Sequence, residues 1–174
     1  LKPVNVPVTI HGRHVTLQPI SENEINERYL SWLNDPEVNQ FLETRYVTPS
    51  KKTIRDYING LRSKPGCELF GIFTKKEKIH VGNLSISQYN PSNQGLASYG
   101  QMIGEGRARA LGVGGEVSAL IVEFLFRDPK IHKVWGAALA SNVNAWRTSE
   151  FLGFRREGTL RNHSISIGDQ RRSR

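Results

Sequence analysis

A glycine-rich segment, Arg109-Ala-Leu-Gly-Val-Gly-Gly115, holds the residues whose spacing best suits a chemical role. It follows an apolar run, 97–103, that predicts a strand, and it precedes an amphipathic run, 116–127, that predicts a helix. Glycines at a helix entrance leave backbone amides uncovered, and the helix dipole adds partial positive charge there. The segment therefore suits a phosphate or pyrophosphate, although a glycine-rich turn without a ligand has the same pattern. It is not a Walker loop, because no Gly-Lys-Ser/Thr follows.

Length and composition predict one globular domain, residues 1–174. The chain has 174 residues, of which 37% are hydrophobic, enough for a core of its own. A single cysteine, Cys67, excludes an intrachain disulfide and suggests a reducing compartment. No apolar run approaches the ~20 residues of a membrane span, and the first residues do not resemble a secretory signal. We therefore expect a cytoplasmic protein without a membrane partner.

The formal net charge of +8 raises the question of nucleic-acid binding. Six arginines lie in residues 155–174 against only Glu157 and Asp169, so half of the excess charge is in this tail. Aromatic residues do not alternate with these arginines as they do in single-strand binders. A nucleic-acid partner is therefore not expected, and the charge fits a solvated tail or attraction to an anionic ligand.

The first half of the chain predicts a hairpin, several helices and then strands. Gly12-Arg13 lies between β-type runs, and Ser21-Glu22-Asn23-Glu24 has the form of a capping box before a helix. Asp35-Pro36 and Thr48-Pro49 each predict a helix start. Residues 68–74 and 79–88 predict two strands joined by a charged turn.

The second half alternates strand and helix. After the strand at 97–104 and its helix, we expect a strand at 132–139, a helix capped by Ser141-Asn142 and closed by Gly153, and a last strand from Phe154. The order predicts a mixed α/β domain: a mostly antiparallel central sheet with helices on both faces.

At this point the chain resembles the GNAT-superfamily N-acetyltransferases, in the branch typified by the RimJ/RimL ribosomal-protein acetyltransferases. Four motifs carry the likeness, which covers roughly residues 8 to 161: Arg109-x-x-Gly-x-Gly114, Asn142-x-x-Ala145 with Gly153-Phe154, Trp32-Leu-Asn-Asp-Pro-Glu-Val38, and Ile79-His-Val-Gly-Asn-Leu84.

The resemblance implies acetyl-CoA as donor, a primary amine as acceptor and no metal. By the family pattern, the backbone amides of Leu111, Gly112, Val113, Gly114 and Gly115 would hold the CoA pyrophosphate, with Arg109 adding charge at the loop mouth. The strand that ends at Gln101-Met102-Ile103 would carry the pantetheine arm. A free amide near Met102 or Ile103 would polarise the thioester carbonyl, and Asn142 would bond to the pantetheine.

Two positions depart from the family pattern. Ser149 stands where many members have a tyrosine as general acid. Its hydroxyl can donate a hydrogen bond to the departing thiolate, but it is equally well read as an ordinary polar helix residue. Ser98 stands where a strand carboxylate is common, so no base is identified by motif. Glu68, His80 and Glu105 are candidates by residue type alone.

The acceptor is the least determined partner. Arg45, Tyr46 and His80 are the candidate substrate-binding residues, and an arginine beside an aromatic suits a nucleotide-linked sugar. They equally suit an acidic protein N-terminus. The Trp32–Val38 opening is similar to that of GNAT enzymes of surface-polysaccharide amino-sugar pathways, which favours a small molecule such as an amino-sugar nucleotide. The alternatives are a protein N-terminal acetyltransferase and an inactive CoA- or RNA-binding module.

The end of the chain predicts an incomplete sheet. Family folds finish with two antiparallel strands, and residues after Gly168-Asp169 show no apolar alternation that could form the second. We expect the open edge to be filled by further C-terminal residues or by a second copy in a homodimer.

Overall fold

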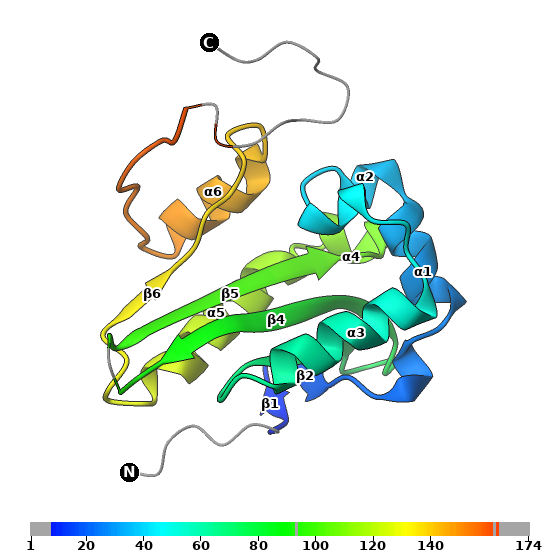
Figure 1. Cartoon of the computed structure of the whole chain (residues 1–174), viewed down its shortest axis with the longest axis horizontal. Coiled ribbons are helices and arrows are strands. Elements are labelled where there is room, and N and C mark those ends of the chain that lie inside the picture. Colours follow the sequence, from blue (N-terminus) through cyan, green and yellow to red (C-terminus); the bar gives the residue numbers. More distant parts are fainter. Residues whose placement is uncertain (1–7, 93, 162, 164–174) are drawn as a thin grey trace.

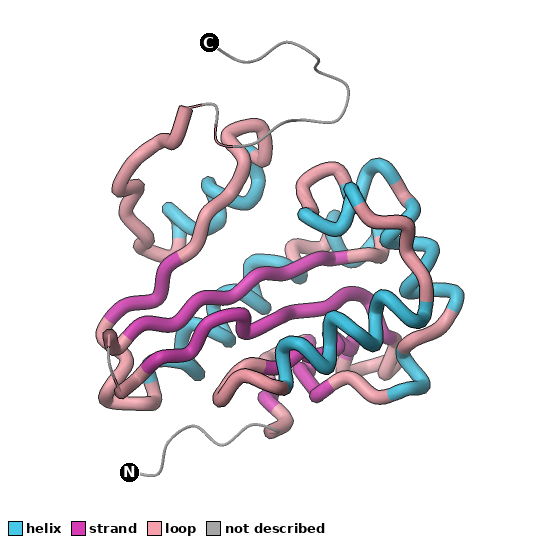
Figure 2. The backbone as a smooth tube through the Cα atoms, viewed as in Figure 1, coloured by secondary structure: helices cyan, strands magenta, loops and turns pink. Residues whose placement is uncertain are grey.

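The computed structural model describes residues 8–92, 94–161 and 163. Its centre is a six-stranded sheet in which the strands follow one another in sequence order, β1 to β6. All neighbouring pairs are antiparallel except β5 and β6, which are parallel. Helices α1 to α3 lie on one face and α5 lies behind the other, as Figures 1 and 2 show. The expected mixed, mostly antiparallel sheet between helices is confirmed.

The strands are close to the predicted ones up to β5. The hairpin around Gly12-Arg13 pairs β1 and β2, and the strand predicted at 68–74 is β3. Two register shifts, at Ile72/Phe73 and at Ile86/Gln88, interrupt the ladders of β4. The bounds are Ile10–His11 for β1, Val15–Pro19 for β2, Glu68–Thr74 for β3, His80–Asn90 for β4, Leu96–Ile103 for β5 and Lys133–Trp135 for β6.

Helix α5 (Val113–Phe126) anchors the larger core. Val117, Ile121 and Leu125 are fully buried on it and belong to one core cluster with residues of β2, β3, β4 and β5. Burying such a side chain stabilises the fold by about 1.5–3 kcal/mol. The buried face fixes α5 against the sheet, so the loop at its N-terminus is held at the end of β5.

The smaller core lies between the sheet and helices α1 (Glu27–Asn34), α2 (Pro36–Asn39) and α3 (Lys51–Arg62). Trp32 of α1 packs directly over Gly104, where an added Cβ would lie 2.0 Å from the indole ring. Met102 is the member of this cluster that β5 contributes. The C-terminal end of β5 is therefore covered by α1 on one face and by α5 on the other.

Helix starts follow local capping, with two corrections to the predicted pattern. The Ser21–Glu24 capping box is present, but it begins a 3-10 helix at Glu22–Glu24. Helix α1 begins later, with Asn26 as its N-cap. The device expected at Thr48-Pro49 is wrong: Ser50 caps α3, because its hydroxyl accepts from the amide of Thr53. Asp35 and Pro36 begin α2 as predicted.

The C-terminal region differs most from expectation. The strand predicted at 132–139 is reduced to the three residues of β6, and α6 (Val143–Phe151) follows with no buried residue. Residues 152–161 contain no strand, so the predicted start of a last strand at Phe154 is wrong there. Phe154 instead packs half-buried against the α5 core. The rest of that predicted strand, and the tail arginines at 171, 172 and 174, lie outside the described residues.

Candidate functional site

The glycine loop joins two helices at the end of β5. The short helix α4 (Gly106–Ala110) leads into Leu111, and Gly112 then turns the chain into α5 with a left-handed backbone at φ 73°. Only glycine adopts this conformation without steric cost. No atom lies within 4 Å of the position that a Cβ would take on Gly112 or on Gly115. The loop thus presents open backbone rather than side chains.

Two amides at this turn are without a backbone acceptor in the described part of the chain. Gly112 donates to the carbonyl of Arg109 and Gly115 to that of Gly112, whereas Val113 and Gly114 begin α5, where no residue one turn earlier can accept. Helix α5 has fourteen residues, so its dipole contributes positive potential at these amides. The geometry is that of an anion site.

Arg109 holds the loop to the strand. Its Nη1 donates to the carbonyls of Gly104, at 2.7 Å, and Ile103, at 3.1 Å. Its Nη2 lies 3.5 Å from a carboxylate oxygen of Glu37. The sequence suggested only a positive charge at the loop mouth. The structure shows that most of the guanidinium's hydrogen bonds orient the end of β5 beside the loop.

A second hydrogen bond connects β5 to the glycine loop. The side-chain amide of Gln101 on β5 donates to the carbonyl of Gly114 at 3.0 Å. An added Cβ on Gly114 would lie 3.3 Å from that amide nitrogen, so glycine there allows the close approach. No sequence pattern predicts this contact, because it joins positions thirteen residues apart.

Beyond their first residues, β5 and β6 separate. They pair only from Leu96↔Lys133 to Ser98↔Trp135, so Tyr99 to Ile103 have no strand partner on the β6 side among the described residues. Figure 1 shows β6 diverging from β5 and leading away to α6. The open edge of β5 runs straight to the glycine loop, forming a continuous row of backbone donors and acceptors.

Alternation decides which residues of β5 face this open edge. The Gly95 carbonyl accepts from the amides of His132 and Lys133, and it therefore points towards β6. The Gly104 amide donates to Val81 beside β4. Since backbone groups alternate in direction along a strand, Tyr99, Gln101 and Ile103 present N–H and C=O to the open edge. Met102 presents its own towards β4.

Helix α6 carries the two remaining residues suggested for CoA and catalysis. Asn142 is its N-cap, and its Oδ1 accepts from the Ala145 amide at 3.3 Å, which leaves the side-chain NH₂ to donate. Ser149 donates from Oγ to the Ala145 carbonyl at 3.1 Å. A thiolate would have to compete for that proton with a carbonyl of the same helix.

Arg45 and Tyr46 contact each other. The guanidinium lies 4.4 Å from the centre of the Tyr46 ring and donates to its hydroxyl at 2.7 Å. Both line a hollow of about 280 Å³ with residues of α1 and the loop before α3. The arginine–aromatic pair expected from the sequence is thus assembled, on the side of the molecule that α1 and α2 form.

The third suggested substrate residue, His80, is buried under α1. Its ring packs against Trp32, at 4.9 Å between centres, and stacks on Phe73, at 5.1 Å. Nε2 lies 3.0 Å from Oδ1 of Asn83, and Nδ1 is buried without a partner in the described structure. Burial lowers the pKa of His80 most strongly, although the Asn83 hydrogen bond opposes it. His80 is therefore neutral at pH 7 and 7% exposed.

The two carboxylates considered as bases are engaged elsewhere. Glu68 is buried and accepts two hydrogen bonds from Nε of Arg62, at 2.8 and 3.0 Å. Glu105 accepts from the indole of Trp32 at 3.2 Å and lies 3.7 Å from Arg28. Each has a structural partner at the edge of the smaller core.

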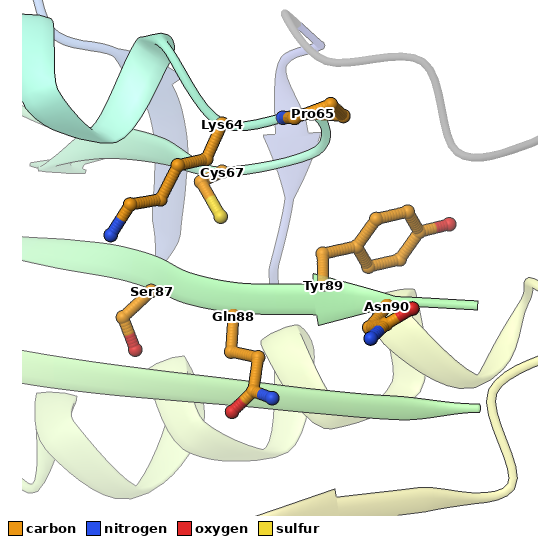
Figure 3. A pocket seen from close by; sticks show the side chains of 7 residues that line it. All are labelled: Lys64, Pro65, Cys67, Ser87, Gln88, Tyr89 and Asn90. Carbon is orange, nitrogen blue, oxygen red and sulfur yellow. The ribbon is translucent and has the colours of Figure 1, made fainter. Parts of the chain in front are cut away.

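A hollow of about 370 Å³ lies where α3 runs into β3, beside β4 (Figure 3). Lys64 and Cys67 form one wall, and Ser87 and Gln88 of β4 form the other. Burial raises the pKa of the Cys67 thiol, so the thiol is protonated and unreactive at pH 7.

No group of three metal-binding side chains occurs in the part of the chain that the structure describes. The same residues include no helix long and apolar enough to cross a membrane.

The family model and the curated relatives that match this chain are all acetyltransferases. The model of the acetyltransferase (GNAT) domain family matches residues 14–155. The Bacillus subtilis protein named "Probable N-acetyltransferase YjcK" is 27% identical over 115 residues, which are 66% of this chain and 62% of that relative. Aminoglycoside N(6')-acetyltransferase type 1 of Klebsiella pneumoniae is 23% identical over 167 residues, covering 88% of this chain and 80% of the relative.

Solved structures share the fold at lower identity. RimL, a ribosomal L7/L12 alpha-N-protein acetyltransferase in complex with coenzyme A, superposes with a TM-score of 0.79 at 17% identity, covering 93% of this chain and 92% of its own. AAC(6')-Ib in complex with ribostamycin and coenzyme A superposes with a TM-score of 0.71 at 19% identity, covering 86% and 87%.

Proposed function

The chain belongs to the acetyltransferase (GNAT) domain family, which transfers acetyl groups from acetyl-CoA to amines. From this premise we propose that it acetylates a primary amine on a small molecule such as an amino-sugar nucleotide. The observation that carries the proposal is the open edge of β5, which ends at the uncovered amides of the glycine loop.

The loop would hold the CoA pyrophosphate. The amides of Val113 and Gly114 face an anion with the dipole of α5 behind them, and Leu111, Gly112 and Gly115 complete the backbone around it. Arg109 acts mainly by positioning, because its guanidinium fixes the end of β5 against the loop. Gln101 does the same from the other side through Gly114.

The open edge would bind the pantetheine arm as a neighbouring strand would. Its amides and carbonyls alternate with those turned to β4, so the arm pairs with Tyr99, Gln101 and Ile103. When an amine attacks the thioester, negative charge develops on the carbonyl oxygen, and a fixed backbone N–H can stabilise it. Of the two amides suggested from the sequence, that of Ile103 faces the open edge and that of Met102 faces β4, so we assign this role to a backbone N–H of the open edge.

Two residues of α6 would complete the donor site. Asn142 has a side-chain NH₂ that can donate to a carbonyl of the pantetheine arm, since its oxygen already caps the helix. Ser149 would stabilise the departing CoA thiolate after rotating its hydroxyl away from the Ala145 carbonyl. Its hydroxyl is a hydrogen-bond donor and not a strong acid, so stabilisation rather than full proton transfer is the role that we propose.

The acceptor assignment rests on similarity and on the charges near the site. The Klebsiella relative acetylates aminoglycosides by its name, and it aligns over most of both chains. The Arg45–Tyr46 pair could contact a phosphate and a ring of a nucleotide-linked sugar. His80 would act only indirectly, by supporting Trp32 beside the end of β5. Cytoplasmic location and a homodimer through the β6 edge remain predictions.

The direct test combines binding with transfer. We expect CoA to bind by calorimetry, and acetyl-CoA to be consumed with an amino-sugar nucleotide or an aminoglycoside. A peptide with a free N-terminus serves as the comparison. Absence of CoA binding would refute the donor site, and transfer to the peptide alone would favour the protein N-terminal acetyltransferase instead.

A further inference from the structure

The face of β4 and β5 that is turned towards helices α1 to α3 carries polar side chains. Along β4, Leu84 and Ile86 turn to the α5 core and are buried there. Ser85, which lies between them, turns to the α1–α3 face. Ser87 follows at the β-bulge of this strand, where its hydroxyl lies 3.3 Å from that of Ser98. On β5 the same face carries Ser98 and Gly100. Helix α3 packs on β3 (Figure 1). On this face of β4 and β5, Ser85 is buried, whereas Ser87 and Gly100 are exposed.

Gly100 is unusual for its position. It lies in the middle of β5, beyond the last residue that pairs with β6, is exposed, and its backbone is not in the left-handed region. An added Cβ would meet only the Ser85 hydroxyl, at an ordinary contact distance of 3.6 Å. A Cβ therefore fits there, and residues other than glycine favour strands. Glycine inside a strand often marks a place where another molecule approaches the backbone closely.

Hydroxyl groups surround Gly100. Ser87 Oγ and Ser98 Oγ lie 3.3 Å apart across the strands. Burial raises the pKa of Tyr57 on α3, and the neighbouring Ser85 hydroxyl lowers it; Tyr57 is 42% exposed. We call these four residues, Tyr57, Ser85, Ser87 and Ser98, the hydroxyl strip. A hydroxyl both donates and accepts, so the strip is matched to the hydroxyls of a sugar-like ligand.

The hydroxyl strip runs over β4 and β5, and the open edge is the side of β5 that faces away from β4. Gly100 stands between Tyr99 and Gln101, whose backbones face that edge. We propose that the hydroxyl strip binds the acceptor and selects amines carried on a hydroxyl-rich ring or chain, with Gly100 leaving room for the ring. This inference rests on the proposed acetyl transfer and specifies its acceptor.

The charges around the strip are of both signs, because Glu43 acts on Tyr57 and Lys64 lines the adjoining hollow. All four side chains of the strip are uncharged. The Glu43 carboxylate lies close enough to Tyr57 to add to the rise that burial causes in its pKa, against the Ser85 hydrogen bond. A carboxylate at this rim attracts an ammonium group and repels an acidic chain. Beyond Ser87 the surface continues into the hollow of about 370 Å³ in Figure 3, enough for a further ring.

The test compares acceptors and variants under the same conditions. Kanamycin is the hydroxyl-rich amine, spermidine the amine without hydroxyls, and kcat/KM is measured for each with saturating acetyl-CoA. We expect wild type to favour kanamycin at least tenfold. The double variant S87A/S98A should raise the KM for kanamycin roughly tenfold, from two lost hydrogen bonds. Ser31→Ala, an exposed serine of α1 whose hydroxyl bonds only to its own helix, is the matched control.

Gly100→Val provides the sharper variant. Its melting temperature should equal or exceed that of wild type, and its affinity for CoA by calorimetry should be unchanged, because the added side chain points away from the open edge. Its KM for kanamycin should rise at least tenfold. Equal use of spermidine, or an unchanged kanamycin KM in both variants, overturns the inference while acetyl transfer stands. A wild type that binds no CoA refutes the proposed function itself.

Discussion

Substitution of Gly112 should lower both the stability of the fold and the affinity for CoA, and the two effects can be measured separately. Its φ of 73° lies in the region where an L-residue pays roughly 1–2 kcal/mol, and the space around it is open, so no clash adds to this. Gly112→Ala should therefore lower the free energy of unfolding by about that amount. For a chain of 174 residues, this corresponds to a fall in melting temperature of roughly 2–8 °C.

The effect on CoA is isolated by a second pair of variants. Gly112→Gln and Gly112→Glu share the same backbone strain and nearly the same volume, and only the second places a carboxylate beside the pyrophosphate site. Two like charges ~6 Å apart at an effective dielectric of about 20 repel by roughly 3 kcal/mol. Water at the open loop reduces this, so a tenfold difference in Kd between the variants is the smallest that we expect.

Gly115→Ala is the matched control. Gly115 lies in the first turn of α5 with an ordinary helical backbone and open space around it. Alanine should stabilise the helix there by about 0.5–1 kcal/mol, the opposite sign to Gly112→Ala. Urea denaturation followed by circular dichroism measures stability, and calorimetry measures CoA binding. If Gly112→Glu keeps a native spectrum and binds CoA as wild type does, the pyrophosphate lies elsewhere.

Three further outcomes are expected. Ser149→Ala should lower kcat ~10-fold to ~10,000-fold with little change in the KM for acetyl-CoA, and wild-type activity would remove Ser149 from the mechanism. Arg109→Met should weaken CoA binding and lower the melting temperature together, because it frees the end of β5; a change in CoA affinity alone would contradict the positioning role. Burial tends to raise the pKa of Glu116, but hydrogen bonds from the His14 and Val15 amides lower it overall. Glu116→Gln should therefore destabilise at pH 7, and the difference in urea midpoint should shrink as acid protonates the wild-type carboxyl; a constant difference would be inconsistent with this.

Much of the fold was predictable because its signals are local. The hairpin at Gly12-Arg13, the Asp35-Pro36 helix start and the strand at 68–74 depend on turn chemistry, capping and alternation within a few residues. The helix start at the glycines belongs to the same class, although α5 begins earlier than the predicted 116, at Val113, so that Gly114 and Gly115 lie in its first turn.

Predictions failed where the outcome depends on neighbours. The run at 132–139 has β-type composition, but only three of its residues find a partner on β5 before the strands separate. The predicted start of a last strand at Phe154 has no described strand to pair with, and Phe154 packs on the core instead. Strand formation needs hydrogen bonds from a second chain segment, which composition alone does not provide.

The sequence by itself determined the class of fold and the glycine-rich helix start that we propose as the anion site, because each follows from periodicity and glycine content along a continuous stretch. Only the tertiary structure decided that Arg109 holds the end of β5, that His80 is buried under Trp32, and that hydroxyls gather around Gly100. Those contacts join residues from different strands and helices. Their directions depend on register and on which face each helix covers, and both are set by the packing of the whole chain.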